Sequence, residues 1–346
     1  MHKIQLPSYM VRGRQILGHI PEFVEEIGLS NASPALIVCD KITHQFTSII
    51  EQQDAFEVLG HTITNASMQE VDACKEKIKT HQVKFVFGVG GGRPIDVAKL
   101  AATQMSIPYI SVPTALSHDG IASCRASIED GREKYSIAAK SPLAVIFDLA
   151  VIEKAPRRLF SAGCGDSIAN YTAVLDWRLA HRIKSEYYGG YAAQLSMMTA
   201  ETVIQEATQM HADYEHALNV LSEALISSSV AMAIAGSSRP ASGSEHLFSH
   251  ALDQVAPQPA LHGEQCGVGT IMMAYLHDSR ISWKEIKKTL MTLGAPTTAV
   301  ELGIEPKHII KALTIAHKIR DRFTILGSEG LTEKAAQQLA TVTDVI

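Results

Sequence analysis

The stretch FVFGVGGGRPIDVAK at residues 85–99 decides the fold of this chain. A short apolar run passes through four glycines and continues into a helical pattern, with Pro94 near its first turn. This order predicts a strand, a tight loop and a helix N-terminus. Because glycine lacks a Cβ, backbone N–H groups can approach a ligand closely, and the helix start adds partial positive charge. The loop therefore suits a pyrophosphate. Its G-x-G-G-G spacing matches neither the dinucleotide fingerprint nor a P-loop, and tight strand–helix packing is the structural alternative.

The residues around this loop alternate between short apolar runs and helical patterns. Strands are expected at 35–39, 56–59, 84–89, 109–112 and 144–147, helices at 71–80 and 93–103, and a hairpin at 127–137 that turns at Asp130-Gly131. Strands separated by helices of this length indicate βαβ units and a parallel sheet. The hairpin turn follows from the Asp-Gly pair.

The composition changes near Pro156, where Ala, Leu, Met, Glu and Lys replace the Val- and Ile-rich runs. Residues 187–210, 215–235 and 244–254 carry apolar side chains at helical spacing. The sequence thus predicts an α/β fold class: a Rossmann-like parallel-sheet domain over 1–154 and an all-helical domain over 155–346. A cleft between two such domains is a favoured place for a ligand.

Composition excludes several classes of protein. The net charge of −5 is dispersed, without the basic block that nucleic-acid binding requires. The sequence contains no run of about 18 apolar residues, so no membrane span is predicted. The first residues lack the apolar core of a secretory signal. The five cysteines are scattered and never in C-x-x-C spacing, which favours reduced thiols and a cytoplasmic protein.

Polar residues beside these elements are candidates for a site. Asp40 follows the first predicted strand, where it either accepts hydrogen bonds from an adenosine ribose or forms an Asx-turn, and Lys41 leaves room for a 2′-phosphate. His246 and His250 are four residues apart and share one helix face. Asp166 begins a helical pattern, so its alternative role is an N-cap.

Five ordered motifs together carry a family resemblance. They are the glycine loop, TALSHDGIAS at 114–123, GCGDS at 163–167, SEHLFSH at 244–250 and HGE at 262–264. From about Pro34 to beyond Met273 the chain resembles the glycerol dehydrogenase-like branch of the iron-type alcohol dehydrogenase and dehydroquinate synthase superfamily. Within that branch, GSSRPASGSEH at 236–246 looks most like the sn-glycerol-1-phosphate dehydrogenase family.

The resemblance implies a divalent metal held by Asp166, His246 and His262. One carboxylate and two imidazoles suit zinc with an open position, and they also accept nickel or iron. His250 would then lie near the substrate and act with Asp119, which the resemblance sets beside the substrate hydroxyls.

The resemblance also implies NAD(H) or NADP(H) as the cofactor. The residues expected to contact it are Asp40, Gly90, Gly91, Gly92, Pro94, Asp96, Thr114, Ser117 and Ser123. The implied reaction interconverts dihydroxyacetone phosphate and sn-glycerol 1-phosphate, which forms the backbone of archaeal-type ether lipids. A homo-oligomer is expected.

A phosphorylated substrate needs a cation, and Arg239 lies seven residues before His246. Arginine matches phosphate oxygens bidentately, so Arg239 is the candidate phosphate ligand, and a surface salt bridge is its alternative role. Two rival functions stay open. A glycerol dehydrogenase needs no phosphate ligand. A dehydroquinate synthase-like lyase typically has a lysine near its acidic ligand, which the run DSIAN at 166–170 lacks.

Overall fold

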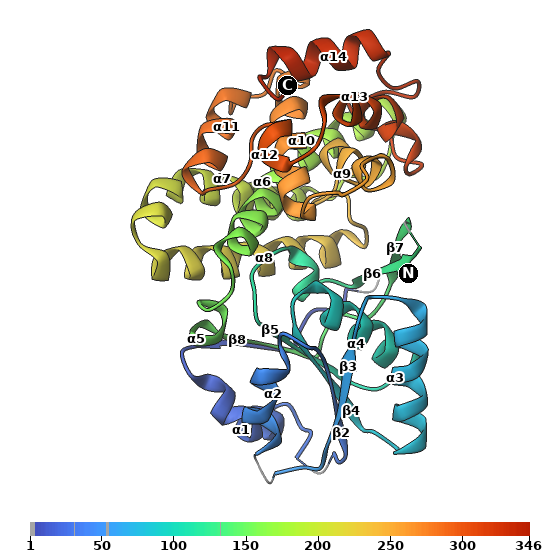
Figure 1. Cartoon of the computed structure of the whole chain (residues 1–346), viewed down its shortest axis with the longest axis vertical. Coiled ribbons are helices and arrows are strands. Elements are labelled where there is room, and N and C mark those ends of the chain that lie inside the picture. Colours follow the sequence, from blue (N-terminus) through green and yellow to red (C-terminus); the bar gives the residue numbers. More distant parts are fainter. Residues whose placement is uncertain (1–3, 31, 53–54, 132) are drawn as a thin grey trace. The chain divides into compact units, whose positions relative to one another are not determined.

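The computed structural model describes residues 4–30, 32–52, 55–131 and 133–346, which form two compact units. One unit is an α/β domain of residues 4–116 and 120–156. The other comprises residues 117–119 and 157–346. Figure 1 shows the strands gathered in the first unit and long helices in the second.

Six parallel strands form the sheet of the α/β unit (Figure 1). Their order is β1 (Tyr9–Gly13), β8 (Ala144–Asp148), β5 (Tyr109–Pro113), β4 (Phe85–Gly90), β2 (Ala35–Asp40) and β3 (Val58–Ile63). The helical segments are η1 (Ile16–His19), α1 (Ile20–Glu26), α2 (His44–Glu51), α3 (Met68–Thr80), α4 (Gly92–Met105), η2 (Asp119–Ile121) and α5 (Leu149–Ile152). The strands β6 (Arg125–Asp130) and β7 (Glu133–Ala138) form a separate antiparallel hairpin.

The middle strands are covered on both faces, so they read as continuous apolar runs rather than alternating ones. Phe85, Phe87 and Val89 of β4 pack in one core cluster with Leu17 and Ile20 of the η1–α1 segment. On the opposite face, α4 lies so close that a Cβ on Gly88 would come within 3.1 Å of the Ala98 Cβ. The glycine in this strand is therefore a packing requirement.

The predicted parallel-sheet fold class is confirmed, although several element boundaries shift by a few residues and α1 and α2 were not predicted. The strand expected at 56–59 lies at Val58–Ile63, and β1 was not predicted. The reason is visible in the burial of β1. It is an edge strand whose residues alternate between partly buried and exposed positions, so it lacks the apolar run that marked the middle strands.

The second unit is built from helices, and no strand lies between residues 155 and 346, all of which are described. Its elements are α6 (Arg157–Lys184), α7 (Gly190–Ala212), α8 (Tyr214–Ala235), α9 (Ser244–Val255), α10 (His262–Leu276), α11 (Trp283–Thr292), α12 (Ala299–Leu302), α13 (Pro306–Ile315), η3 (Ala316–Lys318) and α14 (Glu333–Val342). The central helix α6 packs against α7, α8, α9, α10 and α11. Being covered on most sides, it has no single apolar stripe.

Helices α6 and α10 touch backbone to backbone. A Cβ on Gly263 would lie 1.9 Å from the Ala162 carbonyl oxygen, and a Cβ on Gly165 would lie 2.3 Å from the Gly263 carbonyl oxygen. No side chain fits into either gap. The glycines of GCGDS and HGE therefore set the separation of the two helices that carry Asp166 and His262.

Helix α8 is long and apolar enough to cross a membrane by length and composition, contrary to the expectation of no such run. It is the only helix of this kind among the described residues, and 61% of its apolar window is buried within the protein. A single case is weak evidence for a membrane span, because the core helix of a globular domain is also apolar on all sides.

All five cysteines are free thiols.

We expect Gly263→Ala to lower the free energy of unfolding by about 1–3 kcal/mol, because the added methyl group must push two packed helices apart. Urea or thermal unfolding monitored by circular dichroism measures the loss. Gly190→Ala is the matched control, since a Cβ at that helical glycine meets no atom within 4 Å. A Gly263→Ala protein as stable as Gly190→Ala would contradict the close-contact argument.

Candidate functional site

Three helices of the second unit bring Asp166, His246 and His262 together. Asp166 lies in the interior of α6, so its alternative role as an N-cap is wrong. Its Oδ1 atom is 3.4 Å from Nε2 of His246 on α9 and 3.7 Å from Nε2 of His262, the first residue of α10. The two imidazole rings are 4.9 Å apart between centroids. Three donor atoms therefore face one point.

These separations fit a metal ion. Donor atoms bonded tetrahedrally at about 2.0–2.1 Å lie roughly 3.3–3.4 Å apart. Oδ1 of Asp166 is buried and accepts no hydrogen bond, which leaves its charge directed at the two rings. The other nitrogens are already held: Nδ1 of His246 lies 3.0 Å from Glu245 Oε1, and Nδ1 of His262 lies 3.0 Å from Ser249 Oγ. Such outer contacts orient imidazole ligands in metal sites.

Cys266 is a fourth group at this site, and the sequence analysis did not select it. The ligand atoms of all four residues lie within 4.8 Å of one another, and Cys266 Sγ is 3.6 Å from His262 Nε2. Its spacing was a usable signal, since residues 262 and 266 are one helical turn apart and share a face.

The pKa values of Asp166 and Cys266 shift in opposite directions. Burial alone would raise the pKa of Asp166, but the interaction with His246 and the charges of His262 and His118 lower it to about 2. Burial would lower the pKa of His246, yet the interactions with Cys266, Asp166 and Glu245 raise it well above its usual value. Burial raises the pKa of the Cys266 thiol to about 11. At neutral pH the site thus presents an anionic Asp166 and an uncharged thiol.

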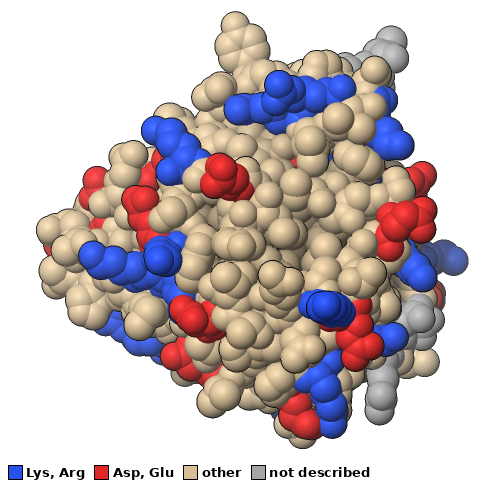
Figure 2. All heavy atoms as spheres, turned by 90° about the horizontal axis from the view of Figure 1, so that it is seen from above, with Lys and Arg blue, Asp and Glu red and all other residues tan. Residues whose placement is uncertain are grey.

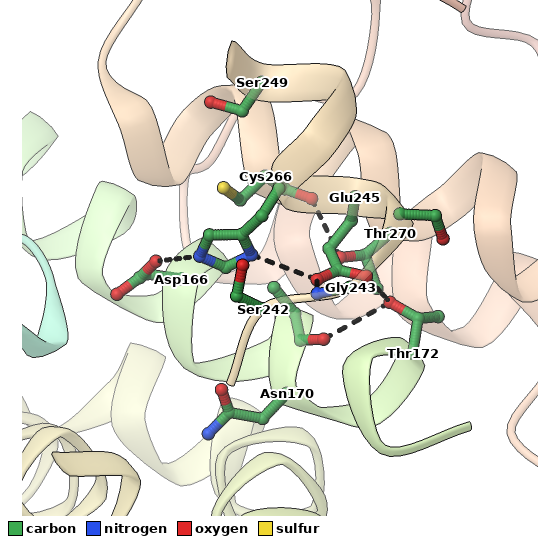
Figure 3. A network of polar contacts seen from close by, with 12 residues as sticks. Asp166, Asn170, Thr172, Ser242, Gly243, Glu245, Ser249, Cys266 and Thr270 are labelled. Carbon is green, nitrogen blue, oxygen red and sulfur yellow. Dashed lines mark hydrogen bonds and ion pairs between the residues drawn. The ribbon is translucent and has the colours of Figure 1, made fainter. Parts of the chain in front are cut away.

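Two further buried carboxylates hold the N-terminus of α9 in place, and Figure 3 shows the first of them, Glu245, beside Gly243 and Thr172. Glu245 accepts hydrogen bonds from Gly243 N and from Thr172 Oγ1 at 2.6 and 2.8 Å, in addition to its contact with His246. Asp176 of α6 accepts from the backbone N–H and the hydroxyl of Ser244. The metal-facing histidine is therefore anchored to α6 through its own helix start.

Asp119 and His250 border this cluster. The backbone N–H of Asp119 donates to Asp166 Oδ2 at 2.9 Å, and its side chain accepts from Ser228 Oγ at 2.7 Å. The His250 ring lies 5.5 Å from the His262 ring. Both residues expected beside the substrate are thus within contact distance of residues at the metal-facing cluster.

The glycine loop of the α/β unit joins β4 to α4, as predicted. Gly90 has a φ of 152°, and a Cβ on it would lie 2.8 Å from Pro94 Cγ. A Cβ on Gly91 would meet no atom within 4 Å, and no side chain caps the N-terminus of α4. An open approach to uncapped backbone N–H groups at a helix start fits the pyrophosphate of a dinucleotide.

The other residues expected at the cofactor have structural partners. Asp40 ends β2, and its Oδ1 accepts from the N–H groups of Ile42 and Thr43, which is the Asx-turn alternative. Asp96 is buried, with one oxygen on Lys99 Nζ and the other on Ser127 N.

Three more of these residues lie near the strand ends. The N–H of Thr114 donates to the Gly90 carbonyl at 3.0 Å, Ser123 contacts the backbone of Arg125, and Ser117 is partly exposed.

Arg239 is buried rather than exposed at the surface. Its side chain is 6% exposed and forms a fork on both carboxylate oxygens of Glu186, with a further hydrogen bond of 2.8 Å to the Phe323 carbonyl. Two arginines that the sequence analysis missed lie nearby: Arg320 contacts His250, and Arg322 contacts Ser242 and Ser238. No motif marked them, because they follow the last segment of the resemblance.

Comparison with known proteins agrees with this fold. Residues 11–156 match the iron-containing alcohol dehydrogenase family. A probable glycerol dehydrogenase from Sinorhizobium meliloti has the same fold, with a TM-score of 0.81 at 17% identity over 99% of this chain and 98% of that one. A sulfoacetaldehyde reductase from Bifidobacterium kashiwanohense, solved in complex with NAD+, has a TM-score of 0.73 at 16% identity over 99% and 98%.

The curated relatives are much closer in sequence. The glycerol-1-phosphate dehydrogenase [NAD(P)+] of Pyrococcus abyssi is 50% identical over 100% of both chains. The enzyme of that name from Methanosarcina mazei is 52% identical over 99% of this chain and 96% of its own. With this identity over the full length, the chain belongs to the glycerol-1-phosphate dehydrogenase [NAD(P)+] family.

Proposed function

We propose that this chain interconverts dihydroxyacetone phosphate and sn-glycerol 1-phosphate, with NAD(H) or NADP(H) as the hydride carrier. The observation that carries the proposal is the convergence of Asp166 Oδ1 with Nε2 of His246 and His262. The names of the full-length relatives supply the substrate.

Asp166, His246 and His262 would hold a divalent metal, with zinc as the proposed ion. When bound, the metal polarises the substrate oxygen and the nicotinamide carries the hydride. Glu245 and Ser249 keep the two imidazoles in register by holding their Nδ1 atoms. Asp119 and His250 would orient the substrate hydroxyls at the edge of this cluster, so that oxidation of the alcohol yields the ketone, reduced cofactor and one proton.

We also propose a cellular location, an oligomeric state and a class of substrate. The free cysteines support a cytoplasmic protein, and a homo-oligomer is expected. Figure 2 shows basic and acidic side chains interspersed on the face it draws, without a continuous basic surface, which supports a small-molecule substrate over a nucleic acid. Light scattering on the purified protein measures the oligomeric state.

Two rival functions give different results in one assay. We expect purified protein to oxidise NADH or NADPH in step with dihydroxyacetone phosphate, and chiral analysis to identify the product as sn-glycerol 1-phosphate. A glycerol dehydrogenase would turn over glycerol as well as the phosphate ester. A lyase would release phosphate without net change in the nicotinamide. Either of these results would contradict the proposal.

We expect a chelator to abolish activity and zinc or nickel to restore it. His262→Ala should reduce bound metal and lower activity by more than the roughly 10–100-fold that loss of an outer hydrogen-bond partner costs. Metal content by mass spectrometry and NADH oxidation measure the two effects. Cys266→Ala is the control and should keep its metal. Equal metal loss in both variants would mean a closed four-ligand site, against the proposed open position.

We expect Gly91→Val to raise the KM for the cofactor by roughly tenfold to a hundredfold, about 1.4–2.7 kcal/mol. The backbone at Gly91 (φ −81°, ψ −161°) accepts any residue and the Cβ meets no protein atom, so only a bound pyrophosphate would collide with it. Gly60→Val, at an exposed strand glycine with open space, is the control. An unchanged KM for both NADH and NADPH would show that the loop is structural.

A further inference from the structure

We infer that Arg320 and Arg322, rather than Arg239, hold the phosphate group of the substrate and so set the preference for a phosphorylated triose. This inference rests on the proposed function, because it names the ligands of one part of that substrate. It differs from the sequence-based hypothesis, which selected Arg239 from its distance along the chain to His246.

Arg239 is already neutralised by a partner. Its guanidinium binds the Glu186 carboxylate through Nε and Nη2, and Nη1 donates to the Phe323 carbonyl. A phosphate that bound Arg239 would have to displace a bidentate carboxylate at a buried position, and it would meet the negative charge of Glu186. The Glu186 side chain is 35% exposed, so the pair is only partly buried, but the carboxylate already occupies both Nε and Nη2 of the guanidinium. Arg239 therefore serves to position the loop before α9.

Arg320 lies at the edge of the metal-facing cluster. Its Nη2 atom is 3.2 Å from Nε2 of His250, whose ring lies 5.5 Å from the ring of His262. In dihydroxyacetone phosphate only a few covalent bonds separate the carbonyl oxygen from the phosphorus. A substrate whose carbonyl faces His262 can thus direct its phosphate at Arg320.

Arg322 binds the loop that precedes α9. Its guanidinium donates to the Ser242 carbonyl and, at 2.8 Å, to the Ser238 hydroxyl, and both of these acceptors are neutral oxygens. Ser242 is only 5% exposed, yet its buried hydroxyl has no hydrogen-bond partner. Ser242 is labelled in Figure 3, near Gly243 and the start of α9. An unpaired hydroxyl next to an arginine fits a phosphate oxygen.

The charge balance around Arg322 favours an anion. Arg239 and Arg320 both lie close enough to repel it, whereas Glu186 and Glu245 attract it. Glu186 is bound to Arg239, and Glu245 is bound to Gly243, Thr172 and His246. Burial together with the two neighbouring arginines lowers the pKa of Arg322 to about 9. A phosphate dianion would relieve this excess of positive charge, and the planar guanidinium matches its oxygens.

The test compares Arg320→Ala and Arg322→Ala with the wild type on two ketones, dihydroxyacetone phosphate and dihydroxyacetone. We expect kcat/KM for the phosphate ester to fall about 30- to 1000-fold further than for dihydroxyacetone, which corresponds to about 2–4 kcal/mol. Arg280→Ala is the control, since Arg280 is exposed and pairs with Glu201 in the same unit. Equal losses on both ketones would overturn the inference.

A binding measurement covers variants that fold poorly and separates the two proposals. Inorganic phosphate should raise the melting temperature of the wild type, less so that of Arg322→Lys, and not that of Arg320→Ala or Arg322→Ala. A phosphate effect that persists in Arg320→Ala and Arg322→Lys would overturn the assignment even if Arg322→Ala does not fold. The wild type could fail to turn over dihydroxyacetone phosphate while phosphate still raises its melting temperature and does not raise that of the variants. In that case the proposed function fails and the anion site stands.

Arg239→Ala distinguishes the two arginine assignments. We expect it to lower the melting temperature and to reduce turnover of both ketones alike, because it leaves Glu186 unpaired and loosens the loop before α9. A loss confined to the phosphate ester in Arg239→Ala, with none in the other two variants, would return the phosphate to Arg239.

Discussion

The contact between the backbones of α6 and α10 is the constraint on which the helical unit depends. Gly165 and Gly263 leave no room for a side chain between the two helices. Each glycine is adjacent in sequence to a residue of the candidate metal cluster, Asp166 in one case and His262 in the other. Because the helices meet at van der Waals distance, the separation of these two side chains is set by backbone packing, which is stiffer than any hydrogen bond between flexible side chains.

The third metal-facing residue is positioned by buried charge instead of by close packing. Asp176 and Glu245 are both fully buried, and each is surrounded by backbone and side-chain donors at the start of α9. A buried carboxylate without such donors would destabilise the fold. The two acids therefore restrict α9 to a position in which these donors are available, and His246 follows from that position.

The glycine loop, the cluster of Asp166, His246 and His262, and the contacts of Arg239 were not equally predictable from the sequence. The glycine loop, the buried strands and the helices of the second half each have a local pattern of apolar residues and glycines, and these patterns were legible in the sequence. The metal-facing residues were found through ordered family motifs. Cys266 was missed although it shares a helix face with His262, and the partnership of Arg239 with Glu186 joins residues that are 53 positions apart.

By itself the sequence determined the fold class, the strand–loop–helix turn at residues 85–99 and the residue types of the metal-facing cluster. These follow from local backbone preferences, from the period of apolar residues and from short motifs. Only the tertiary structure decided which groups contact each arginine. No local sequence pattern distinguishes Arg239, Arg320 and Arg322. Their contacts differ because the fold brings the Glu186 carboxylate to Arg239, the His250 ring to Arg320 and neutral oxygens to Arg322.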